Sequence, residues 1–142
     1  DVSGAKKTSM YLAEYLLDLG LERAVVVHGN DGLDELTTTT KSVVCEVKDG
    51  RLTKYELNPE DYGINIVKSE DIAGGTPEEN AKITLDILNG VKGPKRDIVV
   101  LNAGAALLAG KVVDSIKDGV KMAQELIDSK KALAKYNELR QN

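Results

Sequence analysis

The sequence is poor in several residues whose abundance marks particular protein classes. It has no Trp, no Phe, one Cys and one His in 142 residues. The single cysteine, Cys45, cannot form an internal disulfide, which indicates a reduced, cytoplasmic setting rather than a disulfide-rich secreted protein. No apolar run approaches the roughly 18 residues of a membrane span. The first ten residues, DVSGAKKTSM, lack the apolar core of a signal peptide and an initiator Met.

The charge balance disfavours nucleic acid as a partner. There are 19 basic and 23 acidic residues, giving a net charge of -4, and the Lys and Arg residues are scattered rather than gathered in a stripe. With 42% hydrophobic and 30% charged residues, the composition is that of a soluble globular protein. We therefore expect residues 1–142 to form a single domain with its own core.

Apolar spacing predicts helices and strands in alternation. Thr8 or Ser9 is a candidate N-cap for a first helix with an apolar stripe, and Thr76, Pro77 and Glu79 form the capping box of the clearest helix. The expected elements are a helix at 8–20, a fully buried strand at 23–29, a β-hairpin at 42–57, a turn at 58–63, a helix from 76 to Gly90, a second buried strand at 96–104, a helix at 114–129 and a shorter helix after Ser129. The helix at 114–129 has an apolar face made of Ile116, Val120, Ala123 and Ile127. The stripe of the first helix comprises Leu12, Tyr15, Leu16 and Leu19.

The predicted hairpin has a clear turn signal. Asp49-Gly50 lies between two segments of alternating residues, with Val43, Cys45 and Val47 on one face. Across the turn, we expect Thr53, Tyr55 and Leu57 to lie on the same face of the hairpin.

These elements predict an α/β fold. Two very apolar strands, each followed by a loop and a helical segment, indicate a sheet of buried, largely parallel strands with helices on both faces, together with the hairpin. In such sheets, ligands collect at the carboxyl ends of the strands. The acidic residues that follow Val27 and the Asn102 that follows Leu101 would both lie there.

The segment after the first strand, HGNDGLDELTTTT, raises the question of what its acids do. Asp34 and Glu35 are adjacent carboxylates in a glycine-containing loop, and hard oxygen ligands of this kind suit Mg²⁺. Acids in such loops are also often simply solvated, and spacing alone leaves both interpretations open. We interpret Asp31, beside Gly32, as a turn residue.

Several stretches, in order, resemble the anthranilate phosphoribosyltransferases. They are VHGNDGLDEL, CEVKDGRLTKYELNPEDYGI, DIAGGTPEENAKITLDILNGVKGPKRDIVVLNAGAAL and DSIKDGVKMAQELIDSKKALAKYNEL. The resemblance covers nearly the whole chain from about residue 21, and it matches the carboxyl-terminal portion of the family's nucleoside phosphorylase-like or phosphoribosyltransferase-like α/β domain.

The resemblance implies a role for the adjacent acids. In the family, the pair that matches Asp34 and Glu35 binds magnesium that bridges to the diphosphate of phosphoribosyl pyrophosphate. The metal would stabilise the departing diphosphate while the amine of anthranilate attacks the ribose carbon, giving a tryptophan precursor. No catalytic side chain and no substrate-binding side chain in this chain is identified by the resemblance.

The family's helical domain, its GTGGD diphosphate loop and its anthranilate-contacting arginine have no counterpart in this sequence. We therefore expect the chain to need an upstream segment for activity, to be inactive alone and to self-associate through unpaired sheet edges. Two alternatives are a non-catalytic folded fragment or scaffold, and a related phosphoribosyltransferase or nucleoside phosphorylase with another acceptor.

Other polar residues have two interpretations each. His28 could move protons or simply hydrogen-bond to backbone, and Thr37 to Thr40 could contact phosphate or serve as loop and strand-start residues. Gly74-Gly75 could bind an anion or form a turn, and Asn102 could bind near the site or cap the next segment. The segment 104–111 is not a phosphate-binding P-loop, because its glycine spacing is wrong and Val112 replaces the required Ser or Thr.

Overall fold

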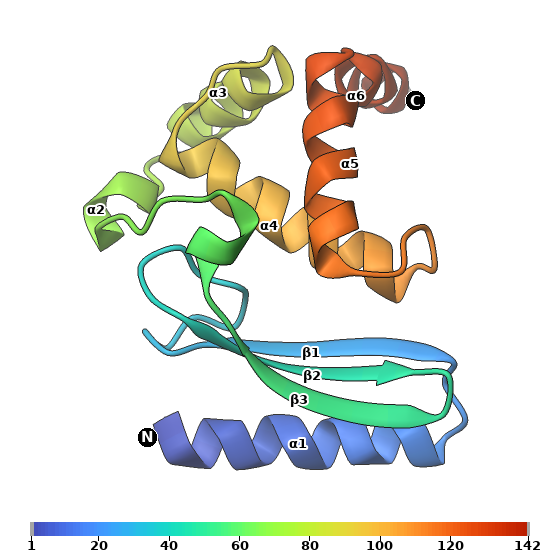
Figure 1. The fold of residues 1–142 in the computed structure, drawn as a ribbon. Coiled ribbons are helices and arrows are strands. Elements are labelled where there is room, and N and C mark those ends of the chain that lie inside the picture. The colour runs from blue at the N-terminus through green and yellow to red at the C-terminus, as the bar shows by residue number, and fades with distance from the viewer. Residues whose placement is uncertain (1, 142) are drawn as a thin grey trace.

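The computed structural model describes residues 2–141 and contains a small sheet with helices on either side (Figure 1). The elements, in chain order, are α1 (Val2–Asp18), β1 (Arg23–Gly29), β2 (Ser42–Lys48), β3 (Arg51–Leu57), the 3₁₀ helix η1 (Pro59–Tyr62), α2 (Ser69–Ile72), α3 (Pro77–Leu88), α4 (Pro94–Ala109), α5 (Ile116–Asp128) and α6 (Lys131–Arg140). Within residues 2–141, no helix is long and apolar enough to cross a membrane.

The three strands form one antiparallel sheet in the order β1-β2-β3. The expectation of largely parallel strands is therefore wrong for this part of the chain. Parallel neighbours need a crossover connection, usually a helix, whereas residues 30–41 form a loop that returns the chain directly beside β1. The expected burial of β1 is also wrong, because most of its residues are only half-buried.

The predicted hairpin is confirmed. Asp49 and Gly50 both have positive φ, 52° and 75°, as a two-residue turn with the twist of the flanking strands requires. Val43, Cys45 and Val47 share one buried face as expected. Tyr55 and Leu57 pair with Val44 and Ser42 instead, which places them on the opposite face of the sheet.

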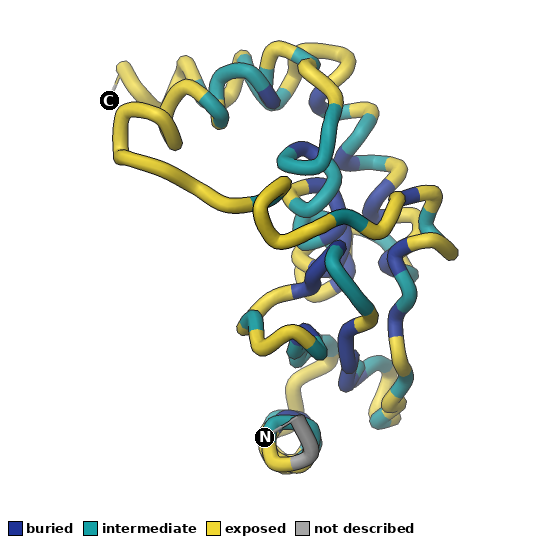
Figure 2. Tube along the Cα trace, turned by 90° about the vertical axis from the view of Figure 1, so that its left-hand side faces the viewer, coloured by how far each residue is buried: buried dark blue, intermediate teal, exposed yellow. Residues whose placement is uncertain are grey.

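Helices cover both faces of the sheet, as predicted. Helix α1 packs along one face, and α4 contacts the other through β1. Figure 1 shows α1 below the strands and α3 to α6 above them, and Figure 2 shows α1 end-on as a separate layer. The sheet therefore divides the apolar core into two clusters, one on each side.

Helix α1 presents a different face to the sheet from the one expected. Ala13 and Ser9 are buried, whereas three members of the predicted stripe are largely exposed: Leu12, Tyr15 and Leu19. Thr8 and Ser9 are not N-caps, because both lie inside the helix, where the Thr8 hydroxyl donates a 3.0 Å hydrogen bond to the carbonyl of Gly4.

The predicted strand at 96–104 is instead part of helix α4. Gly93 precedes the helix and Pro94 begins it, a position where the missing N–H of proline costs nothing. The buried residues recur at helical spacing, at Val100, Leu101, Gly104, Ala105 and Leu108. The prediction of a strand is wrong because a short buried run has no periodicity of its own, and the Ala- and Leu-rich residues after it extend the helix.

Helices α4 and α5 cross at two glycines. A Cβ on Gly119 would overlap the carbonyl oxygen of Gly104 and lie 2.7 Å from its Cα, and a Cβ on Gly104 would lie 2.7 Å from the backbone N of Val120. Segment 104–111 thus begins inside this crossing. The loop after α4 is tied to the sheet by Arg23, whose guanidinium donates to the carbonyl of Val113 at 2.8 Å and to Asp114 at 2.9 Å.

Helices α3, α5 and α6 lie within about two residues of their predicted positions, whereas the sequence does not predict α2. Thr76 caps α3, and Glu79 completes the capping box. The turn at 58–63 contains η1, and a helix follows Ser129 as expected. The predicted apolar face of α5 is buried along its length: Ile116, Val120, Ala123 and Ile127.

Candidate functional site

The loop between β1 and β2 is organised around Asp31. One carboxylate oxygen of Asp31 accepts hydrogen bonds from the hydroxyls of Thr37 and Thr39, both at 2.6 Å. The other accepts from the backbone N–H of Leu33 at 3.2 Å. Burial acts to raise the pKa of Asp31, but these hydrogen bonds outweigh it and hold the pKa below its ordinary value. Asp31 therefore does more than the predicted turn residue would, because its carboxylate joins both ends of the loop through hydrogen bonds.

The floor of the loop is tightly packed. The backbone N–H of Thr37 donates to the hydroxyl of Ser42 at 3.0 Å, and both residues are fully buried. Gly29 lies against this cluster so closely that a Cβ there would be 2.5 Å from Asp31 Oδ1 and 3.0 Å from Thr37 Cγ2. These contacts favour the structural interpretation of the threonines, since the hydroxyls of Thr37 and Thr39 are already engaged.

Asp34 and Glu35 lie at the outer turn of this loop and are exposed. Within residues 2–141, neither carboxylate forms a hydrogen bond or an ion pair. Leu36, the next residue, is fully buried in the core between the sheet and α4. The loop thus holds two adjacent carboxylates in solvent while anchoring the backbone directly behind them.

Asn102 provides the second anchor of the loop. Its side-chain carbonyl accepts from the backbone N–H of Leu36 at 2.8 Å, and its Nδ2 donates to the carbonyl of Leu36 at 2.8 Å. Asn102 lies within α4 rather than at the end of a strand, so the prediction of its position is wrong. It still hydrogen-bonds to the acidic loop, although not as a cap for the segment that follows it.

A cavity of about 430 Å³ lies beside Asp31 and Glu35, and Asp34 is not among the residues that line it. It is lined by residues of the acidic loop, the α2 region and helix α4: Asp31, Leu33, Glu35, Ser69, Ile72, Ala73, Gly74 and Ile98. The sequence does not predict that α2 and Ile98 line a cavity, because it predicts no helix at 69–72 and places Ile98 in a buried strand. The cavity gives Glu35 a concave surface on which a small molecule could bind.

Gly74 lines this cavity, but the backbone N–H groups of the two residues that follow it already donate hydrogen bonds. The backbone N–H of Gly75 donates to Asn80 Oδ1 at 2.9 Å, and that of Thr76 donates to Glu79 at 2.9 Å. Asn80 also donates back to the carbonyl of Gly75 at 3.2 Å. These bonds favour the interpretation as a turn into α3 over an anion site.

The carboxylates of Asp34 and Glu35 fit a Mg²⁺ site that is completed by substrate phosphates and water, rather than a site enclosed by protein ligands. Across residues 2–141, no cluster of three or more His, Cys, Asp or Glu side chains could enclose a metal ion. Mg²⁺ usually keeps several waters and binds one or two carboxylates together with substrate phosphates. Asp34 and Glu35, exposed and unpaired among the described residues, supply that number of hard oxygen donors.

His28 lies on β1 opposite Val43 and is half-buried. Within the described range, its ring forms no hydrogen bond to backbone or side chain, so neither interpretation of it is decided.

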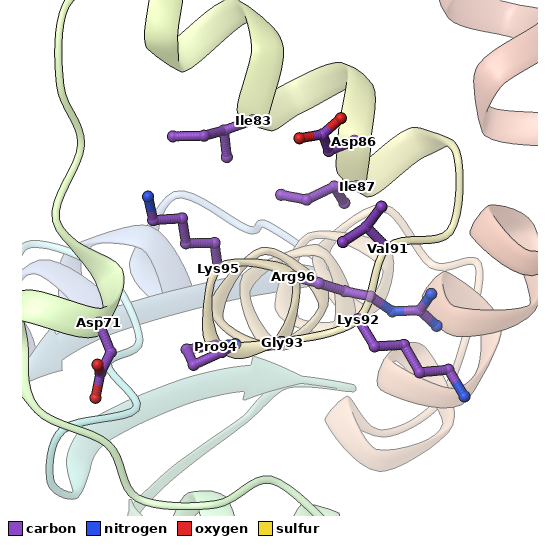
Figure 3. A pocket seen from close by; sticks show the side chains of 10 residues that line it. All are labelled: Asp71, Ile83, Asp86, Ile87, Val91, Lys92, Gly93, Pro94, Lys95 and Arg96. Atoms are coloured by element: carbon purple, nitrogen blue, oxygen red, sulfur yellow. The ribbon is translucent and has the colours of Figure 1, made fainter.

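A second, smaller cavity of about 300 Å³ lies where α3 meets the start of α4 (Figure 3). Lys92, Lys95, Asp71 and Asp86 line it, so its charges are mixed. Figure 3 shows the side chain of Arg96 directed toward α5, where its guanidinium donates to Asp128 at 2.7 Å and 3.1 Å. The hydrogen bond from Arg96 lowers the pKa of Asp128. The guanidinium of Arg96 therefore links α4 to α5, and its charge is paired with Asp128 rather than available to a ligand in the cavity.

The sequence of residues 3–133 matches the glycosyl transferase family, a/b domain. The chain belongs to this family. It is 57% identical over 128 residues to the anthranilate phosphoribosyltransferase of Clostridium beijerinckii, a match that covers 90% of this chain and 38% of that protein. The family resemblance drawn from the sequence is confirmed, and the chain spans 38% of the length of this relative.

Solved structures of anthranilate phosphoribosyltransferases share the fold of this chain. The anthranilate phosphoribosyltransferase of Thermus thermophilus has 41% sequence identity and a TM-score of 0.75, over 86% of this chain and 36% of that chain. The Saccharomyces cerevisiae enzyme in complex with PRPP and Mg has 26% identity and a TM-score of 0.68, over 79% of this chain and 32% of that chain.

Proposed function

We propose that this chain provides the magnesium-binding part of an anthranilate phosphoribosyltransferase. The observation that carries the proposal is the pair Asp34-Glu35, whose carboxylates are exposed and unpaired in the described structure while the loop behind them is anchored twice. Identity of 57% to a relative of that name supports the activity, and a relative in complex with PRPP and Mg supports the ligands.

In this proposal, the enzyme transfers a phosphoribosyl group to anthranilate, a step of tryptophan biosynthesis. The bond between ribose C1 and the diphosphate oxygen breaks, a bond from the anthranilate nitrogen to C1 forms, and the nitrogen loses a proton. Asp34 and Glu35 would hold Mg²⁺, which when bound would stabilise the negative charge that grows on the departing diphosphate. The nucleoside phosphorylase-like arrangement of the whole domain belongs to the same proposal.

Residues of this chain would prepare the site in defined ways. Asp31 keeps the loop closed through Thr37 and Thr39, so the two acids do not have to be ordered when ligand binds. The cavity beside Glu35 offers space for the substrate next to the acids. Ile98 and Ile72 give part of that cavity an apolar wall.

A chimaera tests the proposal. This chain replaces the matching 128 residues of the Clostridium beijerinckii enzyme, and the loss of anthranilate fluorescence measures turnover in the presence of phosphoribosyl pyrophosphate and Mg²⁺. We expect Asp34→Ala/Glu35→Ala to lower turnover by at least ~100-fold, the scale of losing a stabiliser of transition-state charge. The matched control is Glu60→Ala/Asp61→Ala, another pair of adjacent exposed acids, which should leave turnover near the unaltered rate.

Two outcomes would contradict the proposal. A double variant of Asp34 and Glu35 with a near-normal rate would remove the metal assignment. A chimaera that folds and binds phosphoribosyl pyrophosphate without consuming anthranilate would favour another acceptor or a non-catalytic role.

A further inference from the structure

Asn102 joins helix α4 to the acidic loop by an unusually complete contact. Its amide pairs with both backbone groups of Leu36, accepting from the N–H and donating to the carbonyl, each at 2.8 Å. The same Nδ2 donates to the carbonyl of Ile98, one turn earlier in α4, at 3.0 Å. All three hydrogen bonds hold the amide in a single orientation.

The contact pairs backbone groups of Leu36 that the sheet does not pair. Leu36 is fully buried, yet it lies in the loop between β1 and β2, outside the strand ladder. Buried backbone N–H and C=O groups must be paired, and leaving them unpaired is costly. Within residues 2–141, Asn102 supplies the only hydrogen bonds to the backbone of Leu36. Asparagine is otherwise unfavourable inside a helix, so this position is not explained by helix formation.

The position of the contact connects it to the candidate metal site. Leu36 follows Asp34 and Glu35 directly, and Ile98, the other partner of the Asn102 amide, lines the same cavity as Glu35. The Asp31 cluster holds the loop on the side of Gly29 and Thr37, but it makes no bond to Asp34, Glu35 or Leu36. The acids are therefore placed relative to the cavity wall through Asn102.

We propose that Asn102 is a positioning residue for metal binding by Asp34 and Glu35. It fixes the backbone behind the carboxylates against α4, so that Glu35 is held beside the cavity and Asp34 precedes it in the chain. This inference rests on the proposed function, because it assigns Asn102 to the site at which Mg²⁺ and diphosphate would bind. Residues that orient metal ligands typically change metal affinity by about 10- to 100-fold when they are altered.

The test uses the chimaera described above with Mn²⁺ and inorganic diphosphate as probes, and electron paramagnetic resonance measures the affinity for Mn²⁺. Asn102→Leu keeps the branching and the number of side-chain heavy atoms but removes all three hydrogen bonds. We expect it to weaken Mn²⁺ binding by about 10-fold or more. Asn89→Ala is the matched control, because the Asn89 amide donates only to Leu85 of its own helix. Ile127→Ala controls for loss of packing on α4 and α5.

Amide hydrogen exchange adds a readout that general destabilisation would not reproduce. In Asn102→Leu, the amide of Leu36 should exchange faster while that of Thr37, bonded to Ser42, keeps its protection. In the unaltered chimaera, Mg²⁺ with diphosphate should shift the side-chain NH₂ signals of Asn102. That second measurement needs no variant, so the proposal stays testable if Asn102→Leu does not fold.

The outcomes separate the inference from the proposed function. Full Mn²⁺ affinity in folded Asn102→Leu, with loss of affinity in Asp34→Ala/Glu35→Ala, would overturn the inference and leave the proposed function standing. Asn102 NH₂ signals that do not move on ligand binding would overturn it as well. An unaltered chimaera that binds no Mn²⁺, or an acid variant that binds it normally, would overturn the proposed function and the inference together.

Discussion

The loop at residues 30–41 and the crossing of α4 with α5 are both held by close contacts, but of different kinds. In the loop, order comes from directed hydrogen bonds: Asp31 accepts three of them and the Asn102 amide makes two to Leu36. In the crossing, order comes from shape, because Gly104 and Gly119 allow the two backbones to touch. The loop is thus sensitive to loss of a single polar atom, and the crossing to gain of a single carbon.

The difference fits what each region has to do. A hydrogen-bonded loop can expose Asp34 and Glu35 to solvent and still hold its backbone in place, which apolar packing alone could not do. The crossing has no exposed ligand to present, and its role is to hold α4 firmly. Since α4 carries Asn102, the packed region supports the polar one.

The largest effect should follow from adding a methyl group to the crossing. Gly119→Ala should lower the free energy of unfolding by about 3 kcal/mol, because its Cβ would collide with the backbone of Gly104. Gly110→Ala is the matched control, since a Cβ there finds its nearest neighbour at 3.4 Å. Chemical denaturation measures both variants, and equal stabilities would show that the helices can separate without cost.

Removing one hydroxyl from the loop should have the next largest effect. Thr37→Val keeps the shape but loses the bond to Asp31 and the acceptor for the N–H of Thr39, at 3.1 Å. We expect a loss of about 2 kcal/mol in unfolding free energy, as for a buried polar group left unpaired. Thr53→Val, at an exposed strand position, is the control. If Thr37→Val were as stable as Thr53→Val in thermal melts, the hydroxyl would not organise the loop.

A capping variant separates stability from the site. Thr76→Ala removes the acceptor for the N–H of Glu79, at 3.2 Å, and should cost about 1 kcal/mol. Mn²⁺ affinity in the presence of diphosphate should not change, because the N–H groups of Gly75 and Thr76 already donate hydrogen bonds to side chains of α3. Thr84→Ala, in the middle of the same helix, is the control. Loss of diphosphate binding at unchanged stability would instead make the Gly74-Gly75 turn an anion site.

The smallest effect is the pH dependence contributed by Asp31. Its pKa is lower in the folded chain than in the unfolded one, so its ionised form stabilises the fold above the ordinary carboxyl range, and this contribution disappears as the pH falls through the folded value. Melting temperatures of the unaltered chain and Asp31→Asn should therefore differ most near neutral pH and converge in acid. Asp61→Asn, on η1, is the control. A difference that widened in acid would contradict the assignment.

The sequence predicts well what neighbouring residues decide. The turn at Asp49-Gly50 and the capping box at Thr76 are local motifs, and the structure contains both. Asp34 and Glu35 also form a local pattern, but that pattern leaves simple solvation open, and the metal role is implied by the family resemblance. Asp31 is recognisable as a turn residue, but its wider role is not, because its partners Thr37 and Thr39 have no individual motif.

The errors arise where distant residues decide. The apolar run in α4 resembles a strand until its burial at helical spacing and its packing on Gly119 are known. The partner of Asn102 lies 66 residues away in the chain, a distance over which one sequence carries no signal. The direction of β1 depends on whether residues 30–41 form a crossover or a return loop, which composition does not reveal.

Paramagnetic broadening by Mn²⁺ tests the central claim most directly. In the presence of diphosphate, Mn²⁺ should broaden the amide signals around Asp34 and Glu35 first, then that of Gly74 across the cavity, and leave those around Gly119 sharp. Asp34→Ala/Glu35→Ala should abolish the pattern. Broadening centred on another acidic segment, such as Glu60-Asp61, or persisting in the double variant, would contradict a metal site at the end of β1.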